Sequence, residues 1–390
     1  MSAHTLHTRI SALYGALFLT IGIYLPFFPV WLSARGLDAD EIALVLALQI
    51  AVRIVSGPIF SFLADKTGRR RTLLIWLAIV PVAGTLALVV IQSIWLIGLV
   101  AVAAAFFWTP ILPMSEVIAV RGAGEQKLDY GRMRLWGSIA FIVASLGGGL
   151  ALDVMAPDHI IWVLVASHAL IVLALLWLPK QTDPKQDADQ PPKVVRVGDA
   201  ARLLISPLFV VFLLATGLTQ ASHSVYYSFG TLHWQAGGIP GGAIGVLWSL
   251  GVIAEVALFA VSGRAVKLFT PSGLILLGAA AAVVRWAGTA FDPGVVGLAM
   301  LQALHGLTFG ATHLGVIHHI SRTVPDHLHN TAQALYSSVA GGVIIALATA
   351  SAGPLYQAYG ASAFLAASLM AAAAAVFALI LVFARRYSAA

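Results

Sequence analysis

Cysteine is absent from the 390-residue chain, and only 10% of its residues are Asp, Glu, Lys or Arg. Without thiols, the chain can form neither disulfide bonds nor a cysteine metal site, and thiol catalysis is excluded. A soluble domain carries roughly 25% charged residues because its surface must face water. With 60% apolar residues, this chain has too little polar surface for a soluble fold of its length.

Long apolar runs take up most of the chain. A helix needs about 20 apolar residues to cross about 30 Å of hydrocarbon, so the length accommodates twelve spans with short connections. The runs predict spans at 9–32, 41–63, 73–93, 95–119, 133–154, 159–178, 205–230, 241–263, 272–291, 294–320, 331–356 and 359–384. No small-residue cleavage site follows the first run, so we expect it to be retained. The expected fold class is an all-α membrane protein.

The longest polar stretch, 179–202, divides the twelve spans into two sets of six. It is rich in Pro, Asp, Gln and Lys, a composition that cannot bury a core. We therefore predict an N-terminal six-helix bundle over 1–178, a cytoplasmic linker over 179–202 and a C-terminal six-helix bundle over 203–390. Two such halves are typical of secondary transporters, whose substrate site lies near the membrane midplane.

Lys and Arg are distributed unevenly over the connections between spans. Nineteen of the 22 fall on the side that carries both termini, Arg35 falls on the other side, and Arg53 and Arg285 lie inside spans. Because basic loops stay in the cytoplasm, both termini are predicted to be cytoplasmic, in a bacterial-type inner membrane. A net charge of +6 placed in this way encodes topology, so no nucleic-acid partner is expected.

The connection after the second span, SFLADKTGRRRTLL at 61–74, carries a dense cluster of charges. It resembles the signature loop of the major facilitator superfamily, in which an Asp and a Gly are followed by basic residues. Asp65, Gly68 and Arg69 match this pattern, whereas Ser61 stands where the family has a leading Gly. The resemblance implies a gating loop that bonds helix ends in one state and releases them in another. Plain anchoring by basic residues is the alternative.

Ionisable side chains inside the spans carry the strongest functional signal. Each costs ~2.5–3.5 kcal/mol or more at the bilayer centre unless it is paired or hydrated. Two carboxylates and two guanidinium groups at such positions can neutralise each other across an internal cavity. These residues are Arg53, Glu116, Glu255 and Arg285. The alternative for Glu116 is snorkelling to the interface, and for the other three it is a purely structural ion pair.

Polar and aromatic residues complete the candidate site. His305 in the tenth span can exchange a proton near neutral pH, with structural packing as the alternative. Trp136 and Trp248 lie beside polar positions and are candidates for stacking on a flat ligand. One polar face of the seventh span is formed by Gln220, His223 and Tyr227. The histidines between 318 and 329 lack spaced Cys or carboxylate partners, so neither a metal site nor a cofactor is expected.

Several segments resemble the phenylpropionate permease family and, more distantly, the lactose/proton symporter. They are GIYLPFFPVWL (22–32), LDYGRMRLWGSIAF (128–141), ASHSVYYSFGTLHW (221–234), GVIAEVALF (251–259), VVRWAG (283–288) and LHGLTFGATHLG (304–315). The resemblance runs along nearly the whole chain. It implies a major facilitator fold of two pseudo-symmetric six-helix bundles that transports by alternating access. A membrane-embedded enzyme would need a cluster of catalytic carboxylates or metal ligands at the interface, and because no loop of this sequence offers one, we do not expect an enzyme.

The resemblance also implies roles for individual residues. The lactose symporter uses a Glu and an Arg on helices four and five for substrate, and a Glu, an Arg and a His on helices eight to ten for substrate and proton coupling. The matching positions are held by Glu116, Arg134, Glu255, Arg285 and His305. The proton-binding carboxylate one turn beyond that His is Thr308 here, so a proton must sit on Glu255, His305 or Glu116. The Asp/Lys pair of helices seven and eleven is also missing.

The intramembrane cation Arg53 has no counterpart in the sugar symporter and favours an anionic substrate, because Arg binds carboxylates in a bidentate fork. We predict a proton-coupled symporter that imports a small aromatic or other carboxylate, such as a phenylpropionate-like acid, as a monomer. Arg53 or Arg285 is expected to meet the carboxylate. The residues expected against the ring are Tyr227, Trp136 and Trp248. The alternatives are a sugar or nucleoside/proton symporter and a proton-driven exporter of amphipathic compounds.

Overall fold

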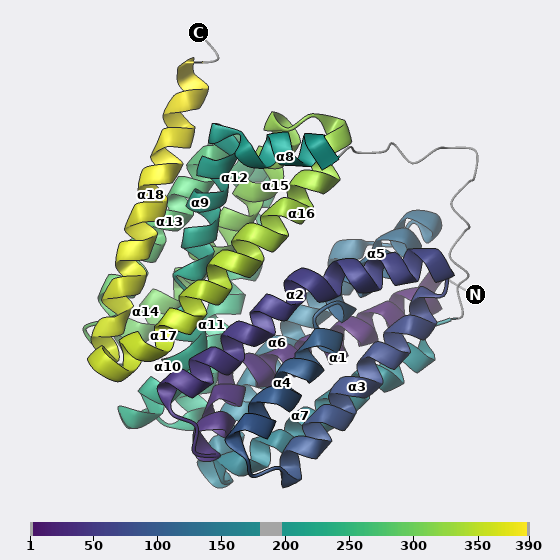
Figure 1. The fold of residues 1–390 in the computed structure, drawn as a ribbon, viewed down its shortest axis with the longest axis vertical. Coiled ribbons are helices and arrows are strands. Elements are labelled where there is room, and N and C mark those ends of the chain that lie inside the picture. Colours follow the sequence, from purple (N-terminus) through teal and green to yellow (C-terminus); the bar gives the residue numbers. More distant parts are fainter. Residues whose placement is uncertain (1–2, 180–196, 388–390) are drawn as a thin grey trace. The chain divides into compact units, whose positions relative to one another are not determined.

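The computed structural model describes residues 3–179 and 197–387, so most of the predicted linker at 179–202 lies outside the described residues. Every regular element in the described part is a helix (Figure 1). The first half contains α1 (Ala3–Ala34), α2 (Ala39–Thr67), α3 (Arg70–Val90), α4 (Ile94–Trp108), α5 (Ile111–Gln126), α6 (Tyr130–Val154), η1 (Pro157–His159) and α7 (Ile160–Trp177).

The second half opens with a short amphipathic helix where the end of the linker was predicted. Its elements are α8 (Val197–Ile205), α9 (Pro207–Ala221), α10 (Ser224–Ala236), α11 (Gly241–Ala260), α12 (Ser262–Leu268), α13 (Pro271–Thr289), α14 (Gly294–Ala303), η2 (Gly306–Ala311), α15 (Thr312–Thr323), η3 (Asp326–Leu328), α16 (His329–Ser338), η4 (Val339–Ile344), α17 (Ile345–Tyr359), η5 (Gly360–Ser362) and α18 (Ala363–Tyr387).

Eleven helical stretches among the described residues are long and apolar enough to cross a membrane. The last stretch, Asp326–Ala384, has 59 residues. At 1.5 Å per residue it is roughly 88 Å long, which is enough for two crossings. Gly360, with a φ of +51°, provides the turn between α17 and α18. The described chain therefore has twelve crossings, as the apolar runs predict.

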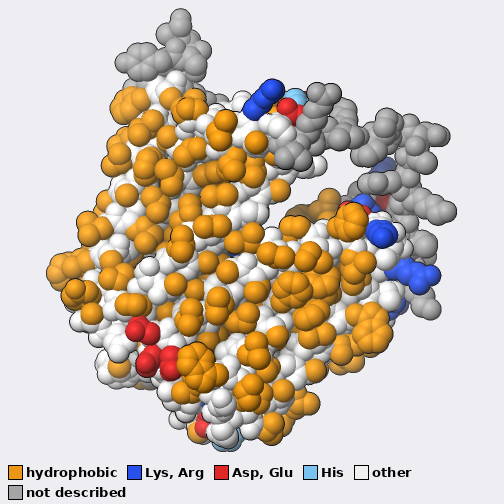
Figure 2. Space-filling model, viewed as in Figure 1, with side chains coloured by type: hydrophobic (Ala, Val, Ile, Leu, Met, Phe, Trp, Pro, Cys, Tyr) orange, Lys and Arg blue, Asp and Glu red, His pale blue; other side chains and the backbone are white. Residues whose placement is uncertain are grey.

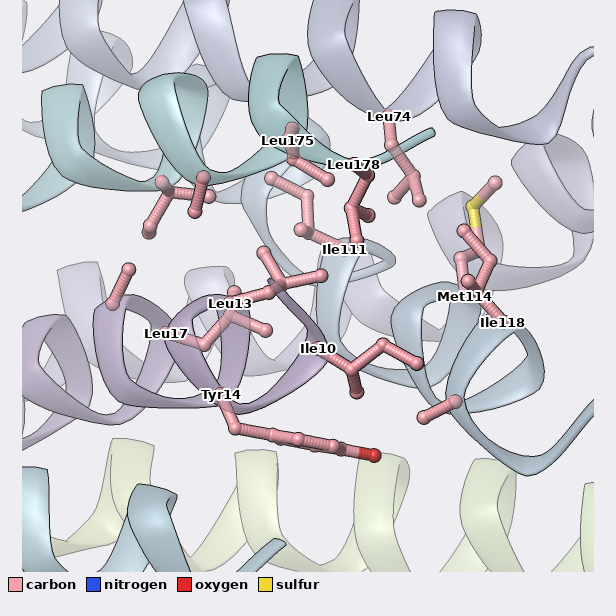
Figure 3. Close-up of a cluster of buried hydrophobic side chains, with 14 of the residues drawn as sticks. Ile10, Leu13, Tyr14, Leu17, Leu74, Ile111, Met114, Ile118, Leu175 and Leu178 are labelled. Carbon is pink, nitrogen blue, oxygen red and sulfur yellow. The ribbon is translucent and has the colours of Figure 1, made fainter. Parts of the chain in front are cut away.

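Contacts divide the chain into two compact units. The first unit covers Met1–Asp38, Ala51–Gln190 and Trp234–Ser249. Its core lies where α1 packs against α6 and α7, with α3 also against α7. Figure 3 shows a buried apolar cluster of this unit, in which Leu13, Ile111 and Leu175 come from α1, α5 and α7.

Small residues bring the start of α11 close to α6 within the first unit. A Cβ atom on Gly149 of α6 would collide with the backbone of Gly241 and Gly245. The Asp153 carboxylate accepts hydrogen bonds from the backbone N–H groups of Gly241 (2.6 Å) and Gly242 (2.8 Å). These bonds satisfy donors that the start of a helix leaves unpaired. In lipid, close packing of small residues is a main source of helix association.

The second unit covers Ala39–Ile50, Pro191–His233 and Leu250–Ala390. Its core is built where α18 packs against α9 and α13, and α13 against α15. Each unit therefore takes most of one predicted half together with a short segment of the other. The bundle boundaries at 178 and 203 remain a prediction.

Apolar side chains also cover the outside of the protein. Figure 2 shows them over most of the face in view, and Trp95 exposes 81% of its surface. An exposed apolar surface of this extent is unfavourable in water and favourable against hydrocarbon. The packing is thus that of a chain whose exterior faces lipid.

Candidate functional site

Two interrupted helices of the second unit carry a cluster of polar side chains. α9 ends at Ala221 and α10 begins at Ser224, so His223 lies in the break between them. In the span Gly294–Thr323, the π-helical turn η2 begins directly after His305 and contains Thr308. Such interruptions in membrane helices redirect side chains and are frequent at functional sites.

Arg285 on α13 is the centre of this cluster, and its side chain is fully buried. Its Nη1 donates to Nδ1 of His305 and to Oγ1 of Thr308, each at 3.0 Å. Its Nη2 donates to Oε1 of Gln302 at 2.6 Å. The guanidinium is therefore held by three side chains that need carry no charge.

Aromatic rings cover the faces of the same guanidinium group. Its central carbon lies 4.4 Å from the ring centroid of Trp286 and 5.1 Å from that of Tyr226. Trp286 is fixed in turn because its Nε1 donates to Oγ of Ser222 at 2.8 Å. Cation–π contacts of this kind stabilise a desolvated cation by about 2 kcal/mol.

The hydrogen-bond partners of the two histidines locate their protons. Because Arg285 can only donate, Nδ1 of His305 must accept, and a neutral His305 carries its proton on Nε2. Nδ1 of His223 lies 3.2 Å from the carbonyl oxygens of Thr219 and Gln220, which only accept. A neutral His223 therefore carries its proton on Nδ1, and its Nε2 accepts from the Thr308 hydroxyl at 3.0 Å.

Glu255 on α11 lies on the opposite side of His305 from Arg285. Its Oε2 is 3.9 Å from Nε2 of His305, the nitrogen that carries the proton in the neutral ring. A carboxylate at this distance is close enough to stabilise an imidazolium electrostatically. The three side chains therefore form a row in space, in which the imidazole of His305 lies between the carboxylate of Glu255 and the guanidinium of Arg285.

In the described ranges 3–179 and 197–387, Arg285 makes no ion pair. The hydrogen bonds of its guanidinium group run to Gln302, His305 and Thr308, and the group also lies over the rings of Tyr226 and Trp286. Burying an ion costs several kcal/mol, and neutral acceptors recover only part of that free energy. The arrangement is one that an incoming anion would stabilise.

A second, smaller polar cluster lies in the first unit. Nε of Arg134 on α6 is 3.9 Å from Oε1 of Glu116 on α5. The Arg134 guanidinium lies over the rings of Phe18 (4.0 Å) and Tyr14 (5.5 Å) on α1. The structure therefore brings together the two residues predicted for substrate on the fourth and fifth spans.

The other predicted binding residues are divided between the two units. Arg53 and Trp136 belong to the first unit and are exposed, Trp136 by 52%. Trp248 also belongs to the first unit but is buried. Tyr227 belongs to the second unit, where its ring stacks on His223 at a centroid distance of 5.5 Å. Tyr227 therefore lies beside the Arg285 cluster, next to both His223 and Tyr226.

The predicted gating loop of the first unit contains an internal ion pair. Oδ1 of Asp65 is 2.5 Å from Nη2 of Arg70. Gly68 has a φ of +60°, a backbone conformation that would be strained in a residue with a side chain. Arg71 donates to the carbonyl oxygens of Leu175 and Leu176 at the end of α7. Arg69 is exposed. The Asp65 carboxylate is thus paired with the second of the three loop arginines.

Two members of the Arg285 cluster, Gln302 and Thr308, were not predicted as site residues. Gln302 is a polar amide three residues before His305, on the same face of an apolar span, and this position was a usable signal. Thr308 was noted as a polar residue on the same face as His305 and as the replacement of an expected carboxylate, but no site role was predicted for it. Within the described residues, no three His, Asp or Glu side chains gather closely enough to hold a metal ion.

The known sequences that are similar to this chain are membrane transporters. Residues 7–367 match the family model described as the MFS_1 like family. The chain is 32% identical over 358 residues to a protein of Escherichia coli K12 described as a probable 3-phenylpropionic acid transporter, covering 92% of this chain and 93% of that one. It is 27% identical over 336 residues to the maltose permease of Geobacillus stearothermophilus, covering 85% and 82%.

Comparison with solved structures supports the fold. A mutant form of the nucleoside transporter NupG superposes with a TM-score of 0.84 over 97% of this chain and 98% of that one, at 18% identity. At that identity the likeness shows a shared fold only.

Proposed function

Because the chain belongs to the MFS_1-like family of major facilitator transporters, we propose that it imports a small organic acid together with protons. One observation supports an acid as the solute, namely that Arg285 is fully buried and its hydrogen bonds run to neutral acceptors. A guanidinium inside a span is stabilised by an anion, and its fork of N–H groups matches a carboxylate. The relative named for 3-phenylpropionic acid supports an aromatic acid.

Aromatic side chains around Arg285 support the same class of solute. Tyr226 and Trp286 face the guanidinium, and Tyr227 lies beside His223. A flat ring gains contact area and favourable ring geometry against such residues. The acid's carboxylate would meet Arg285 and its ring would pack against these residues. Binding roles for Arg53, Glu116, Arg134, Trp136 and Trp248 stay part of the proposal.

Proton coupling is proposed for the pair formed by Glu255 and His305. In the described arrangement, Arg285 occupies Nδ1 of His305 as a donor. When the carboxylate of the solute binds the guanidinium group, the hydrogen bond from Arg285 to Nδ1 of His305 breaks. The imidazole of His305 can then bind a second proton at Nδ1, and the resulting positive charge lies near Glu255. Solute and proton then favour each other's binding, which is the thermodynamic condition for symport.

The test is uptake of 3-phenylpropionate by purified protein in proteoliposomes. An inward proton gradient should drive accumulation, and Glu255→Gln should abolish accumulation while it spares exchange of internal for external solute. Glu125→Gln, at an exposed carboxylate at the end of α5, serves as the control and should accumulate normally. Undiminished gradient-driven uptake by Glu255→Gln would remove Glu255 from coupling, and no accumulation by the unaltered protein would refute symport.

The same vesicles separate the alternative solutes. Because one relative is a maltose permease, a sugar is the second candidate solute. An exporter would be recognised by net outward flux of the solute. Ligand binding raises the free energy of unfolding by RT ln(1 + [L]/Kd), about 2.7 kcal/mol at one hundred times Kd. A thermal-shift panel of aromatic acids, sugars and nucleosides at two pH values should therefore favour the acids.

A further inference from the structure

We propose that His223 is a second proton-carrying residue of the transport cycle, linked to Arg285 through the hydroxyl group of Thr308. This inference rests on the proposed function and adds a proton to it. His223 is fully buried in the break between α9 and α10. Its ring centroid lies 5.7 Å from that of His305, so the two imidazoles flank the same guanidinium.

The Thr308 hydroxyl can match His223 in either protonation state. When His223 is neutral, the hydroxyl donates to Nε2 at 3.0 Å and its oxygen accepts from Arg285. When Nε2 is protonated, it donates to that oxygen, and the hydroxyl hydrogen turns to the carbonyl oxygen of His305 at 3.5 Å. A hydroxyl has one donor and two acceptor positions, so both arrangements pair every donor with an acceptor.

His305 lacks this freedom. Its Nδ1 faces Nη1 of Arg285, which can only donate, so a proton on Nδ1 would set two donors against each other. His305 can therefore gain a proton only after Arg285 has moved away. His223 is the imidazole of this cluster that can be protonated while the bonds from Arg285 to Gln302, His305 and Thr308 stay intact.

A charge on His223 is linked to the solute by electrostatics. Among the described residues, the titratable and charged groups near its ring are Arg285 from α13, His305 directly before η2, and Tyr227 from α10. Tyr226 lies against Arg285, and Glu255 lies beyond His305. A protonated His223 would share one hydroxyl oxygen with the Arg285 cation, and this repulsion falls when a carboxylate pairs with Arg285. Anionic solute and the second proton therefore bind together.

The experiment counts the protons that cross with each solute. Proteoliposomes loaded with a pH-sensitive dye report protons, and labelled 3-phenylpropionate reports solute. We expect His223→Gln to carry one proton fewer per solute than the unaltered protein, with solute exchange retained. At a pH difference of one unit and no membrane potential, each coupled proton contributes about tenfold to accumulation. Steady-state accumulation should therefore fall about tenfold in this variant.

His168→Gln is the matched control. His168 is also buried in a span, and its Nδ1 also lies against the carbonyl oxygen four residues earlier, Leu164 at 2.9 Å. Its ring contacts Trp108 rather than a guanidinium. The proton count of this variant should equal that of the unaltered protein. An equal count in His223→Gln would overturn the inference.

Substitutions of Thr308 provide an independent test of the same inference. Thr308→Ser keeps the hydroxyl and should keep the proton count, whereas Thr308→Val keeps the shape and should lose one proton. If His223→Gln does not fold, this pair decides, and an unchanged count in Thr308→Val overturns the inference. Absence of any coupled proton in the unaltered protein refutes the proposed function itself, and is recognised before the variants are compared.

Discussion

The Arg285 side chain is buried in the interior of the second unit, and no carboxylate of the described residues forms an ion pair with it. Gln302, His305 and Thr308 accept its hydrogen bonds, and Trp286 and Tyr226 lie against its faces. Neutral acceptors pair Nη1 and Nη2, whereas the buried Nε has no hydrogen-bond partner among the described residues. The net charge is also left uncompensated, so an anion would lower the free energy of this state further. A residue held in this way responds to its ligand strongly.

Gln302 offers a direct test of that response. Gln302→Glu puts a carboxylate where an amide oxygen now lies 2.6 Å from Nη2. This internal anion should compete with the solute and weaken its binding at least about tenfold, or 1.4 kcal/mol, without lowering the unfolding temperature. Isothermal calorimetry with 3-phenylpropionate measures the affinity, and a thermal melt in detergent measures the stability.

Gln302→Leu is the companion variant. It leaves a buried N–H without an acceptor, so it should cost about 1–3 kcal/mol of stability while adding no competing charge. Solute binding that is as tight in Gln302→Glu as in the unaltered protein would contradict a carboxylate-binding role for Arg285.

At the scale of the element, interruptions and close approaches place the cluster. A regular α-helix through 294–323 would present residues every 3.6 positions, whereas the π turn at η2 changes the angular position of every side chain after His305. The break before α10 similarly brings Nε2 of His223 to Thr308, 85 residues further along the chain. The elements were predictable from apolar runs, but these local departures from helical geometry were not.

Two neighbouring glycines of α6 give a matched test of helix packing. A Cβ on Gly149 would collide with the backbone of α11, whereas nothing lies within 4 Å of a Cβ on Gly147. Gly149→Ala should therefore destabilise the folded protein by about 1–3 kcal/mol through overpacking. Gly147→Ala should be neutral or stabilise it by about 0.5–1 kcal/mol, because Ala favours a helix. Thermal melts of the two variants make the comparison, and equal shifts would refute the close approach.

At the scale of the whole molecule, the distribution of Lys and Arg predicts cytoplasmic termini in an inner membrane. Because the chain has no cysteine, single substitutions provide clean labelling sites. Asp158→Cys, between α6 and α7, should react with an impermeant maleimide applied to intact spheroplasts. Glu125→Cys, at the end of α5, should react only in inside-out vesicles. The opposite pattern would invert the topology.

Family membership accounts for how much of this protein was predictable. The charged span residues and the loop with Asp65 and Gly68 resemble those of known carriers. The fold class and the transporter class predicted from this resemblance are confirmed by the comparisons. The substrate, the coupling and the individual roles of the site residues remain proposals. The departures from the lactose symporter, Thr308 above all, indicated where family knowledge would stop.

The amino-acid sequence by itself determined the class of the molecule, because hydrophobic length, charge placement and span number follow from the order of residues alone. It also predicts a transport role for the intramembrane residues Glu255, Arg285 and His305, and this role remains a prediction. Only the tertiary structure decided that Arg285 donates to Nδ1 of His305, and that Thr308 stands between the guanidinium and His223. Donors and acceptors on separate helices are paired by distance and direction, and neither quantity is encoded in composition or periodicity.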